Sequence, residues 1–186
     1  KAANLKVFME LDKQLRAFNY NHDIDGGRCP VGSHMRRTNP RGALEFGNEE
    51  AFDTPGALTD RRRILRRGLP YGQYDPSAAS DNGNHGIIFM ALNASIKRQF
   101  EFVQQQWVNY GNDFKLANDR DPILGQQPQV NGCPHGRMVV EGEKGKRAPF
   151  LCGSIPTFVE MRGGEYFFIP SLTALQLIAG GIVDPT

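Results

Sequence analysis

A short stretch from Cys29 to Arg41, CPVGSHMRRTNPR, combines residue types that could bind a cofactor. One histidine, His34, lies among small and turn-forming residues, and a cationic run follows it at once: Arg36, Arg37 and Arg41. An imidazole can coordinate iron through one nitrogen, and guanidinium groups pair with carboxylates, so the combination suits a heme with its two propionates. The competing interpretation is a loop histidine beside a solvated basic patch, and this stretch alone does not separate the two.

The composition is that of an ordinary soluble globular protein. The 186 residues, 39% hydrophobic and 23% charged, are enough for one good core or two small ones. A net charge of +2 is too small to favour nucleic acid or an anionic membrane as a partner, and no apolar run reaches membrane-spanning length. A second arginine cluster lies at Arg61–Arg67, RRRILRR. Such clusters in a near-neutral chain indicate either a local anionic ligand or two solvated surfaces.

The cysteines indicate a reducing compartment. Cys29, Cys133 and Cys152 make an odd count without a CxxC motif, which disfavours a zinc ribbon and a disulfide framework. Free thiols favour the cytoplasm. The chain shows no signal-like segment and no starting methionine, and it begins in mid-pattern, so a targeting segment could be missing.

The hydrophobic pattern predicts strands and a helix in the first half of the chain. The expected strands are Leu5–Leu11, Arg61–Arg67 and the buried His85–Ala94, and Asp12 is expected to cap a helix at Lys13–Phe18. The long polar segment Asn39–Asp60 reads as a loop.

The second half predicts helices and hairpins. Ser95 should cap a helix at Ile96–Tyr110, and Ser171 another at Leu172–Ala179. Two hairpins are expected, Met138–Glu141 with Phe150–Leu151, and Thr157–Met161 with Glu165–Pro170 across Gly163-Gly164. Antiparallel strands with a few helices indicate an α+β fold rather than a doubly wound sheet.

Four blocks of sequence resemble the C-terminal half of the dye-decolorising peroxidases, a family of heme peroxidases. In the order of that family they are Cys29–Arg41, RRRILRRGLPYG (Arg61–Gly72), GIIFMALNASIKRQFEFVQQQW (Gly86–Trp107) and DPILG (Asp121–Gly125). The resemblance implies a ferredoxin-like antiparallel sheet with helices on one side, one half of a dimeric α+β barrel. Residues 1–186 would then be the heme-binding half, with a segment missing near residues 19–21 and the N-terminal half missing.

The resemblance implies heme b as cofactor and His34 as its proximal iron ligand. The far nitrogen of a proximal imidazole needs an acceptor, which fixes the tautomer and raises electron density on iron. DPILG supplies Asp121 as that acceptor, although an Asp-Pro pair more commonly caps a turn, here before Pro122.

The remaining site residues follow from the same resemblance. The family pattern selects Arg66 as the distal arginine that stabilises charge on peroxide, because guanidinium stays cationic at every working pH. Ile87 and Phe89 alternate onto one face of a strand and would roof the distal pocket, although plain sheet core is an equally compatible role. The candidates for the propionates are Arg36, Asn39 and Arg41.

One family feature is absent from these residues. The distal aspartate that moves the peroxide proton lies in a GxxDG motif, and the chain has only a weak echo, DIDGG at Asp23–Gly27. We therefore expect the N-terminal half of the same protein, or another chain, to supply a distal carboxylate.

Three functions remain open at this point. The favoured one is a heme peroxidase that reduces hydrogen peroxide and oxidises bulky organic donors such as dyes or phenols. The alternatives are a heme-binding domain with little turnover of its own and a heme-free α+β interaction domain. The sequence does not identify the electron donor, and it leaves a homo-oligomer open.

Overall fold

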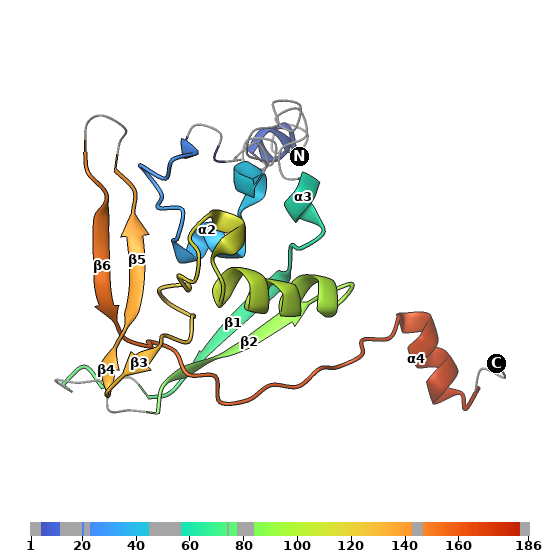
Figure 1. Ribbon diagram of the computed structural model, residues 1–186. Helices are drawn as coiled ribbons and strands as arrows, with labels where there is room; N and C mark the ends of the chain where they lie inside the picture. Colours follow the sequence, from blue (N-terminus) through green and yellow to red (C-terminus); the bar gives the residue numbers. More distant parts are fainter. Residues whose placement is uncertain are drawn as a thin grey trace.

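The computed structural model describes residues 5–11, 20, 23–44, 57–73, 75–77, 84–142 and 147–182. Within these ranges the protein is α+β, as predicted, with three antiparallel two-stranded sheets and several short helices. Figure 1 shows the helix α2 (His34–Thr38) between the β5–β6 hairpin and the ribbon formed by β1 and β2. The predicted helix at Lys13–Phe18 and its cap Asp12 lie outside the described residues.

The ribbon of β1 (Leu65–Tyr71) and β2 (Gly86–Leu92) carries the second and third sequence blocks. The strand predicted at His85–Ala94 forms as β2, but its predicted burial is wrong, because Ile87, Ile88 and most of its other side chains are exposed. The strand predicted at Arg61–Arg67 starts four residues too early. The short helix α3 (Ala57–Asp60) continues into a turn, in which Arg62 N donates to Thr59 O and Arg63 N to Asp60 O. These turn bonds occupy the backbone where the arginine run would otherwise have begun the strand.

The predicted helix at Ile96–Tyr110 forms, but with wide turns. Two π-helical segments, η4 (Lys97–Glu101) and η5 (Val103–Val108), join at Phe102. Bonds such as Glu101 N to Ile96 O, at 3.0 Å, span five residues instead of four. The helix lies across the β1–β2 ribbon in Figure 1.

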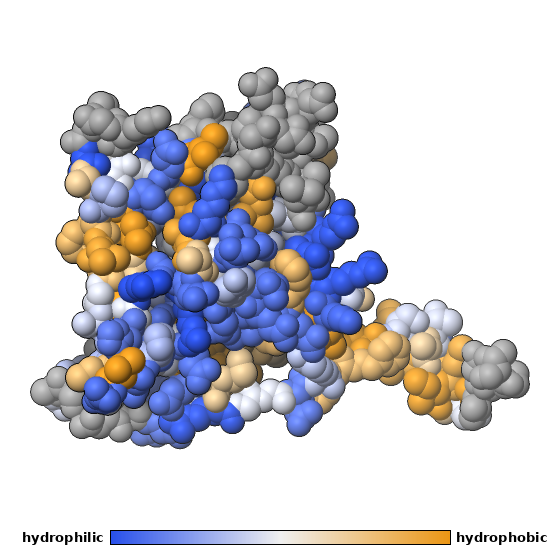
Figure 2. Space-filling view, in the orientation of Figure 1, coloured by the Kyte–Doolittle hydropathy of each residue, from blue (hydrophilic) through white to orange (hydrophobic). Residues whose placement is uncertain are grey.

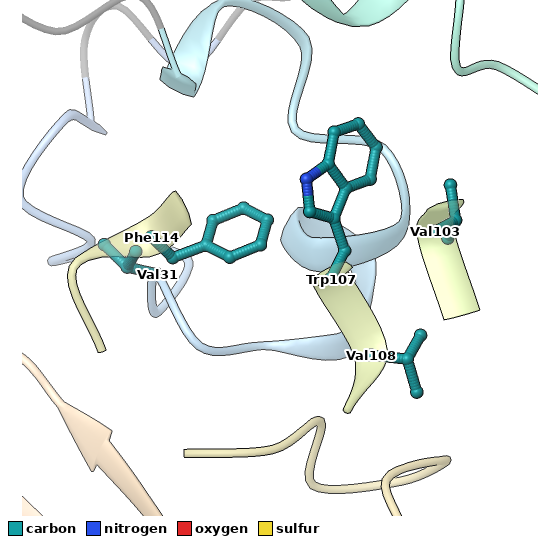
Figure 3. Close-up of a cluster of buried hydrophobic side chains, with 5 residues drawn as sticks. All are labelled: Val31, Val103, Trp107, Val108 and Phe114. Atoms are coloured by element: carbon teal, nitrogen blue, oxygen red, sulfur yellow. The ribbon is translucent and has the colours of Figure 1, made fainter. Parts of the chain in front are cut away.

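The buried core is small and gathers around one tryptophan. Val31, Val103, Trp107, Val108 and Phe114 form it, as Figure 3 shows. The rings of Trp107 and Phe114 meet edge to face with centroids 6.2 Å apart. Because Val31 comes from the loop before α2 and Phe114 from η6 (Asn112–Phe114), this core joins the His34 loop to the end of the long helix.

The hairpin of β5 (Gly136–Val140) and β6 (Phe150–Ile155) confirms the first predicted hairpin. A minimal pair, β3 (Gln129–Val130) with β4 (Cys133–Pro134), precedes it, and η2 (Arg41–Leu44) follows α2. The cysteines are free thiols, as predicted.

Two predicted strand regions are wrong. Residues 5–11 form a helix, and all seven side chains are exposed. No described strand pairs with this segment, so nothing there stabilises an extended backbone. Leu, Lys, Met and Glu in this segment favour helix intrinsically. The predicted hairpin of Thr157–Met161 with Glu165–Pro170 is also absent, since neither described segment pairs as a strand.

The C-terminal arm ends in α4 (Leu172–Ala179), which confirms the last predicted helix. The Ser171 side chain caps it by accepting from Ala174 N at 3.1 Å. Figure 1 shows α4 apart from the other elements, and Figure 2 shows apolar side chains along the arm. Phe167 and Phe168 are 80% and 88% exposed. Among the described helices, none combines the length and apolar character that a membrane crossing requires.

Candidate functional site

The first residue of α2 is His34, and the preceding loop sets its position. Ser33 N donates to Pro30 O at 2.9 Å, and the extended backbone of Ser33 starts the helix. The Ser33 hydroxyl lies 3.2 Å from Cys29 Sγ instead of capping the helix. At the other end of this single turn, Thr38 Oγ1 donates to His34 O at 2.9 Å. The imidazole is thereby held at the surface of the core, with 30% of the side chain exposed.

The acceptor expected for His34 lies within hydrogen-bond distance. His34 Nδ1 is 2.9 Å from Asp121 Oδ2, and the Asp121 side chain is fully buried. The other oxygen, Oδ1, accepts from Ile123 N at 2.8 Å and Leu124 N at 2.9 Å. Asp121 therefore also caps the turn after it, so the two roles weighed for this residue coexist in one carboxylate.

The surroundings of Asp121 keep it ionised. Burial opposes the charged form, but hydrogen bonds from His34 and from the backbone N–H groups of Leu124 and Ile123 hold the pKa of Asp121 below its ordinary value. A carboxylate can only accept, so the proton in this contact lies on His34 Nδ1. In the neutral imidazole, Nε2 of His34 then carries the lone pair that a metal ion requires.

Arg36 makes most of its contacts within the loop before α2. Its fully buried guanidinium donates to Cys29 O at 2.9 Å, Ile24 O at 3.0 Å and Asp23 Oδ2 at 3.3 Å. It also lies over the Tyr20 ring, 4.6 Å from the centroid. These contacts fasten the loop before α2, and they do not favour the predicted role of Arg36 as a propionate partner.

Asn39 and Arg41 follow the end of α2. Asn39 is the C-terminal cap, and its Oδ1 atom is buried without a hydrogen-bond partner in the described structure. Arg41 is half-buried, has a positive φ of 51°, and accepts a hydrogen bond from Thr59 Oγ1 at its carbonyl. The Nε atom of Arg36 is likewise buried without a hydrogen-bond partner in the described structure, so each of the two residues has one polar atom that a ligand group could satisfy.

The distal candidates share one face of the β1–β2 ribbon. Arg66 is opposite Ala91, and Gly68 is opposite Phe89. Since directly paired residues of antiparallel strands point to the same side, Arg66, Ile87 and Phe89 lie on one face. The predicted alternation of Ile87 and Phe89 onto one face is confirmed. Ile87 is 68% exposed and Phe89 48%, and the Phe89 ring lies 6.3 Å from that of Phe100.

Sequence reasoning missed the role of Arg37. It was grouped with the cations available to a ligand, yet its side chain is fully buried and donates to three backbone carbonyls. Two adjacent helical residues cannot point the same way, which is the one signal that could have separated Arg36 and Arg37 in advance. The tertiary fold decides which backbone carbonyls lie within hydrogen-bond distance of a buried guanidinium, and a local motif does not reveal this.

The chain resembles known proteins over most of its length. The family model described as Dyp-type peroxidase, C-terminal, matches residues 16–120. The chain is 32% identical over 171 residues to dye-decolorizing peroxidase msp1 of Mycetinis scorodonius, a match that covers 87% of this chain and 32% of that protein. It is 35% identical over 175 residues to the multifunctional dye peroxidase DyP2 of Amycolatopsis sp., covering 86% and 34%.

Solved structures give the same relationship. A DyP-type peroxidase from Anabaena sp. superposes with a TM-score of 0.60 at 30% identity, covering 78% of this chain and 30% of that one. A variant of the dye-decolorizing peroxidase of Auricularia auricula-judae gives 0.63 at 32% identity, covering 89% and 37%. These relatives have the ferredoxin-like α+β architecture that was predicted.

The chain spans about a third of the length of the relatives it matches. By its matching family model, its relatives and its fold, the chain belongs to the Dyp-type peroxidases and corresponds to their C-terminal part.

Proposed function

We propose that this chain is the heme-binding part of a peroxidase that reduces hydrogen peroxide and oxidises bulky organic donors such as dyes or phenols. The observation that carries the proposal is the hydrogen bond between His34 Nδ1 and the buried carboxylate of Asp121. It would leave the other imidazole nitrogen available for a metal ion and give that nitrogen extra basicity. The relatives named as dye peroxidases support the same reaction class.

The residues around His34 fit heme b as the cofactor. Heme needs a single axial nitrogen from the protein on the proximal side, and His34 Nε2 would provide it. Arg41 and the side-chain N–H group of Asn39 would donate to the propionates, whereas Arg36 has only its buried Nε left for that role because its other two nitrogens donate within the 23–29 loop. When bound, heme would supply the iron that accepts and returns the electrons.

Asp121 would hold the imidazole rather than transfer its proton. The carboxylate stays anionic because its folded pKa is below the ordinary value, so it remains an acceptor for the Nδ1 proton throughout turnover. The backbone bonds from Ile123 and Leu124 prevent the carboxylate from turning away. His34 would therefore keep one tautomer and one orientation.

The face of β1–β2 that carries Arg66 would form the distal side. Its guanidinium would stabilise negative charge on a peroxide oxygen as the O–O bond breaks, because it cannot lose its own proton at working pH. Ile87 and Phe89 on the same face would keep bulk water and large donors away from the reacting oxygen. Large donors would then be oxidised at the surface.

The proton transfer on the distal side needs a carboxylate that is absent from these 186 residues, since no GxxDG motif is present. We propose that the N-terminal half of the same protein, or another chain, supplies it. The strongly exposed apolar side chains of β2, among them Ile87, would be covered by that partner surface. The short connection near residues 19–21 fits a missing segment of chain.

The test is an absorption spectrum of the purified protein with and without hemin, followed by hydrogen peroxide. A Soret band that changes on peroxide addition supports a working peroxidase site. A Soret band that does not respond favours a heme-holding domain whose distal carboxylate comes from elsewhere. The absence of any Soret band, in a sample that circular dichroism shows to be folded, would overturn the proposal.

A further inference from the structure

Arg37 makes an unusual set of contacts for a fully buried arginine. Its Nε donates to Gly32 O, its Nη1 to Trp107 O and its Nη2 to Asp119 O, each at 2.9 Å. The guanidinium also lies over the Phe114 ring, 5.6 Å from the centroid. All three acceptors are neutral carbonyls, and they come from three segments that are far apart in sequence.

Those three segments are the ones that must meet for His34 to reach Asp121. Gly32 lies in the loop that starts α2, two residues before His34. Trp107 precedes Val108, whose carbonyl accepts from Asp121 N at 2.7 Å. Asp119 lies two residues before Asp121. One planar side chain therefore spans both ends of the imidazole–carboxylate pair through the backbone beside each of them.

The charge of Arg37 is placed to support the same pair. Burial lowers the pKa of Arg37 from its ordinary value, while the carboxylates of Asp121 and Asp119 oppose that shift. Arginine keeps its proton in proteins even so. Asp119 is itself paired with Arg137, whereas the Asp121 carboxylate has His34 as its side-chain partner.

We propose that Arg37 is the positioning residue of the proximal site. By holding the Gly32, Trp107 and Asp119 carbonyls together, it sets the distance between His34 Nδ1 and Asp121 Oδ2. It thereby keeps the imidazole in the tautomer whose Nε2 can bind a metal. This control of the His34 tautomer applies to the protein without cofactor, and only its consequence for iron binding rests on the proposed function.

The neighbouring Arg36 provides a matched control. It is buried to the same extent and also donates to two backbone carbonyls and a carboxylate, but all of these lie in the 23–29 loop. A residue needed only for folding should behave like Arg36. A residue that positions Asp121 should affect His34 where Arg36 does not.

The first experiment measures the His34 tautomer by 15N NMR of the imidazole in cofactor-free protein. Unmodified protein should show a single form with the proton on Nδ1. Arg37→Lys retains the charge but cannot reach three carbonyls, so we expect a mixture of the two tautomers. Arg36→Lys should leave the single form intact. A single Nδ1–H form in folded Arg37→Lys, or equal mixing in both variants, would overturn the proposal.

A second measurement does not depend on a folded variant. In unmodified protein, the Arg37 Nε–H and the His34 Nδ1–H should lose their protection from hydrogen exchange together, because one opening event releases both. Protection of the His34 proton that survives after the Arg37 proton has exchanged would show that the pair is held by something else. This test remains decisive if the substituted proteins fail to fold.

With hemin added, Arg37→Lys should retain heme roughly 10- to 100-fold less tightly, the range typical for loss of outer-shell support. In an Asp121→Asn background the same substitution should add little, since Arg37 acts through Asp121. Full additivity of the two losses contradicts the proposal. If unmodified protein binds no heme, the proposed function fails, while the tautomer and exchange tests still decide the role of Arg37.

Discussion

His34 Nδ1 and Asp121 Oδ2 lie 2.9 Å apart although 87 positions separate the two residues in the chain. The contact joins the first turn of α2 to a loop that the end of the long helix anchors through Val108. Because the same carboxylate also accepts two backbone N–H groups, its orientation does not depend on the imidazole. The Asp121 carboxylate is therefore held in its orientation in the protein without a metal ion.

Replacement of His34 by alanine should remove most of the bound heme, because no other described side chain takes the place of its Nε2. The measurement is the ratio of Soret to protein absorbance after hemin addition and gel filtration. His135→Ala is the matched control, since His135 is an exposed residue between β4 and β5 whose backbone N–H donates to Pro128 O. Unchanged heme retention and an unchanged spectrum in His34→Ala would refute the axial role.

Asp121 should make stability depend on pH in the acid range. Its folded pKa lies below the ordinary value of 3.8, so the stability that it contributes is fully present above that value. This contribution is lost as the pH falls through the lower folded pKa. Asp121→Asn should reduce the free energy of unfolding at pH 7 by roughly 1.5–3 kcal/mol, the size of a hydrogen bond to a charged group.

The measurement for Asp121 is urea unfolding of both proteins at several pH values between 7 and 2.5. The two stability curves should converge as the pH drops below about 3.8, because the carboxylate becomes neutral in the unmodified protein too. Curves that stay parallel over the whole range would show that the Asp121 charge does not stabilise the fold.

Arg66 should accelerate the reaction with peroxide without holding the cofactor. Arg66→Leu is expected to keep heme but to slow the peroxide-induced change in the Soret band about 100-fold, as loss of one electrostatic donor does in other enzymes. Stopped-flow absorbance measures the rate. Arg67→Leu is the control, because Arg67 pairs with Met90 on the opposite face of the ribbon. Equal rates for Arg66→Leu and unmodified protein would exclude the distal role.

Residue patterns within short stretches of sequence predicted the elements that depend on neighbouring residues alone. The Ser171 cap of α4, the extended backbone of β2 and the apolar positions Val103 and Trp107 all depend on residues close together in sequence, and all were found. The burial predicted for β2 depends on what covers the strand, and that prediction was wrong. The residues 5–11 were predicted wrongly because a short apolar run without a partner strand is ambiguous between helix and strand.

The pairing of His34 with Asp121 could be expected only from the resemblance, since no periodicity connects positions so far apart. The roles of Arg36 and Arg37 could not be read from a cationic run, because burial of a guanidinium depends on carbonyls gathered by the tertiary fold. The wide turns of the long helix also leave no signature in the apolar pattern. The sequence therefore pointed to the cationic residues near His34. It did not show which of them could bind a ligand and which instead hold the backbone around His34 in place.

The loop that holds Asp121 should not tolerate a side chain at position 125. A Cβ on Gly125 would clash with Asp121 O and lie 2.8 Å from Arg120 Cβ and 2.9 Å from Asp121 N. These contacts are mainly with backbone, which cannot rotate away as a side chain would. Gly125→Ala should therefore destabilise the protein by about 1–3 kcal/mol, measured as the free energy of unfolding in urea.

The same substitution should displace Asp121 from His34 and so disturb the Nδ1–H signal of the imidazole in cofactor-free protein. Gly153→Ala is the matched control, because a Cβ at that position in β6 would meet no atom within 4 Å. Its stability should change by no more than about 0.5 kcal/mol, as for other exposed sites. If both alanine variants were equally stable and kept the His34 signal, the loop would be adaptable, and the rigid acceptor described for the proximal site would have to be abandoned.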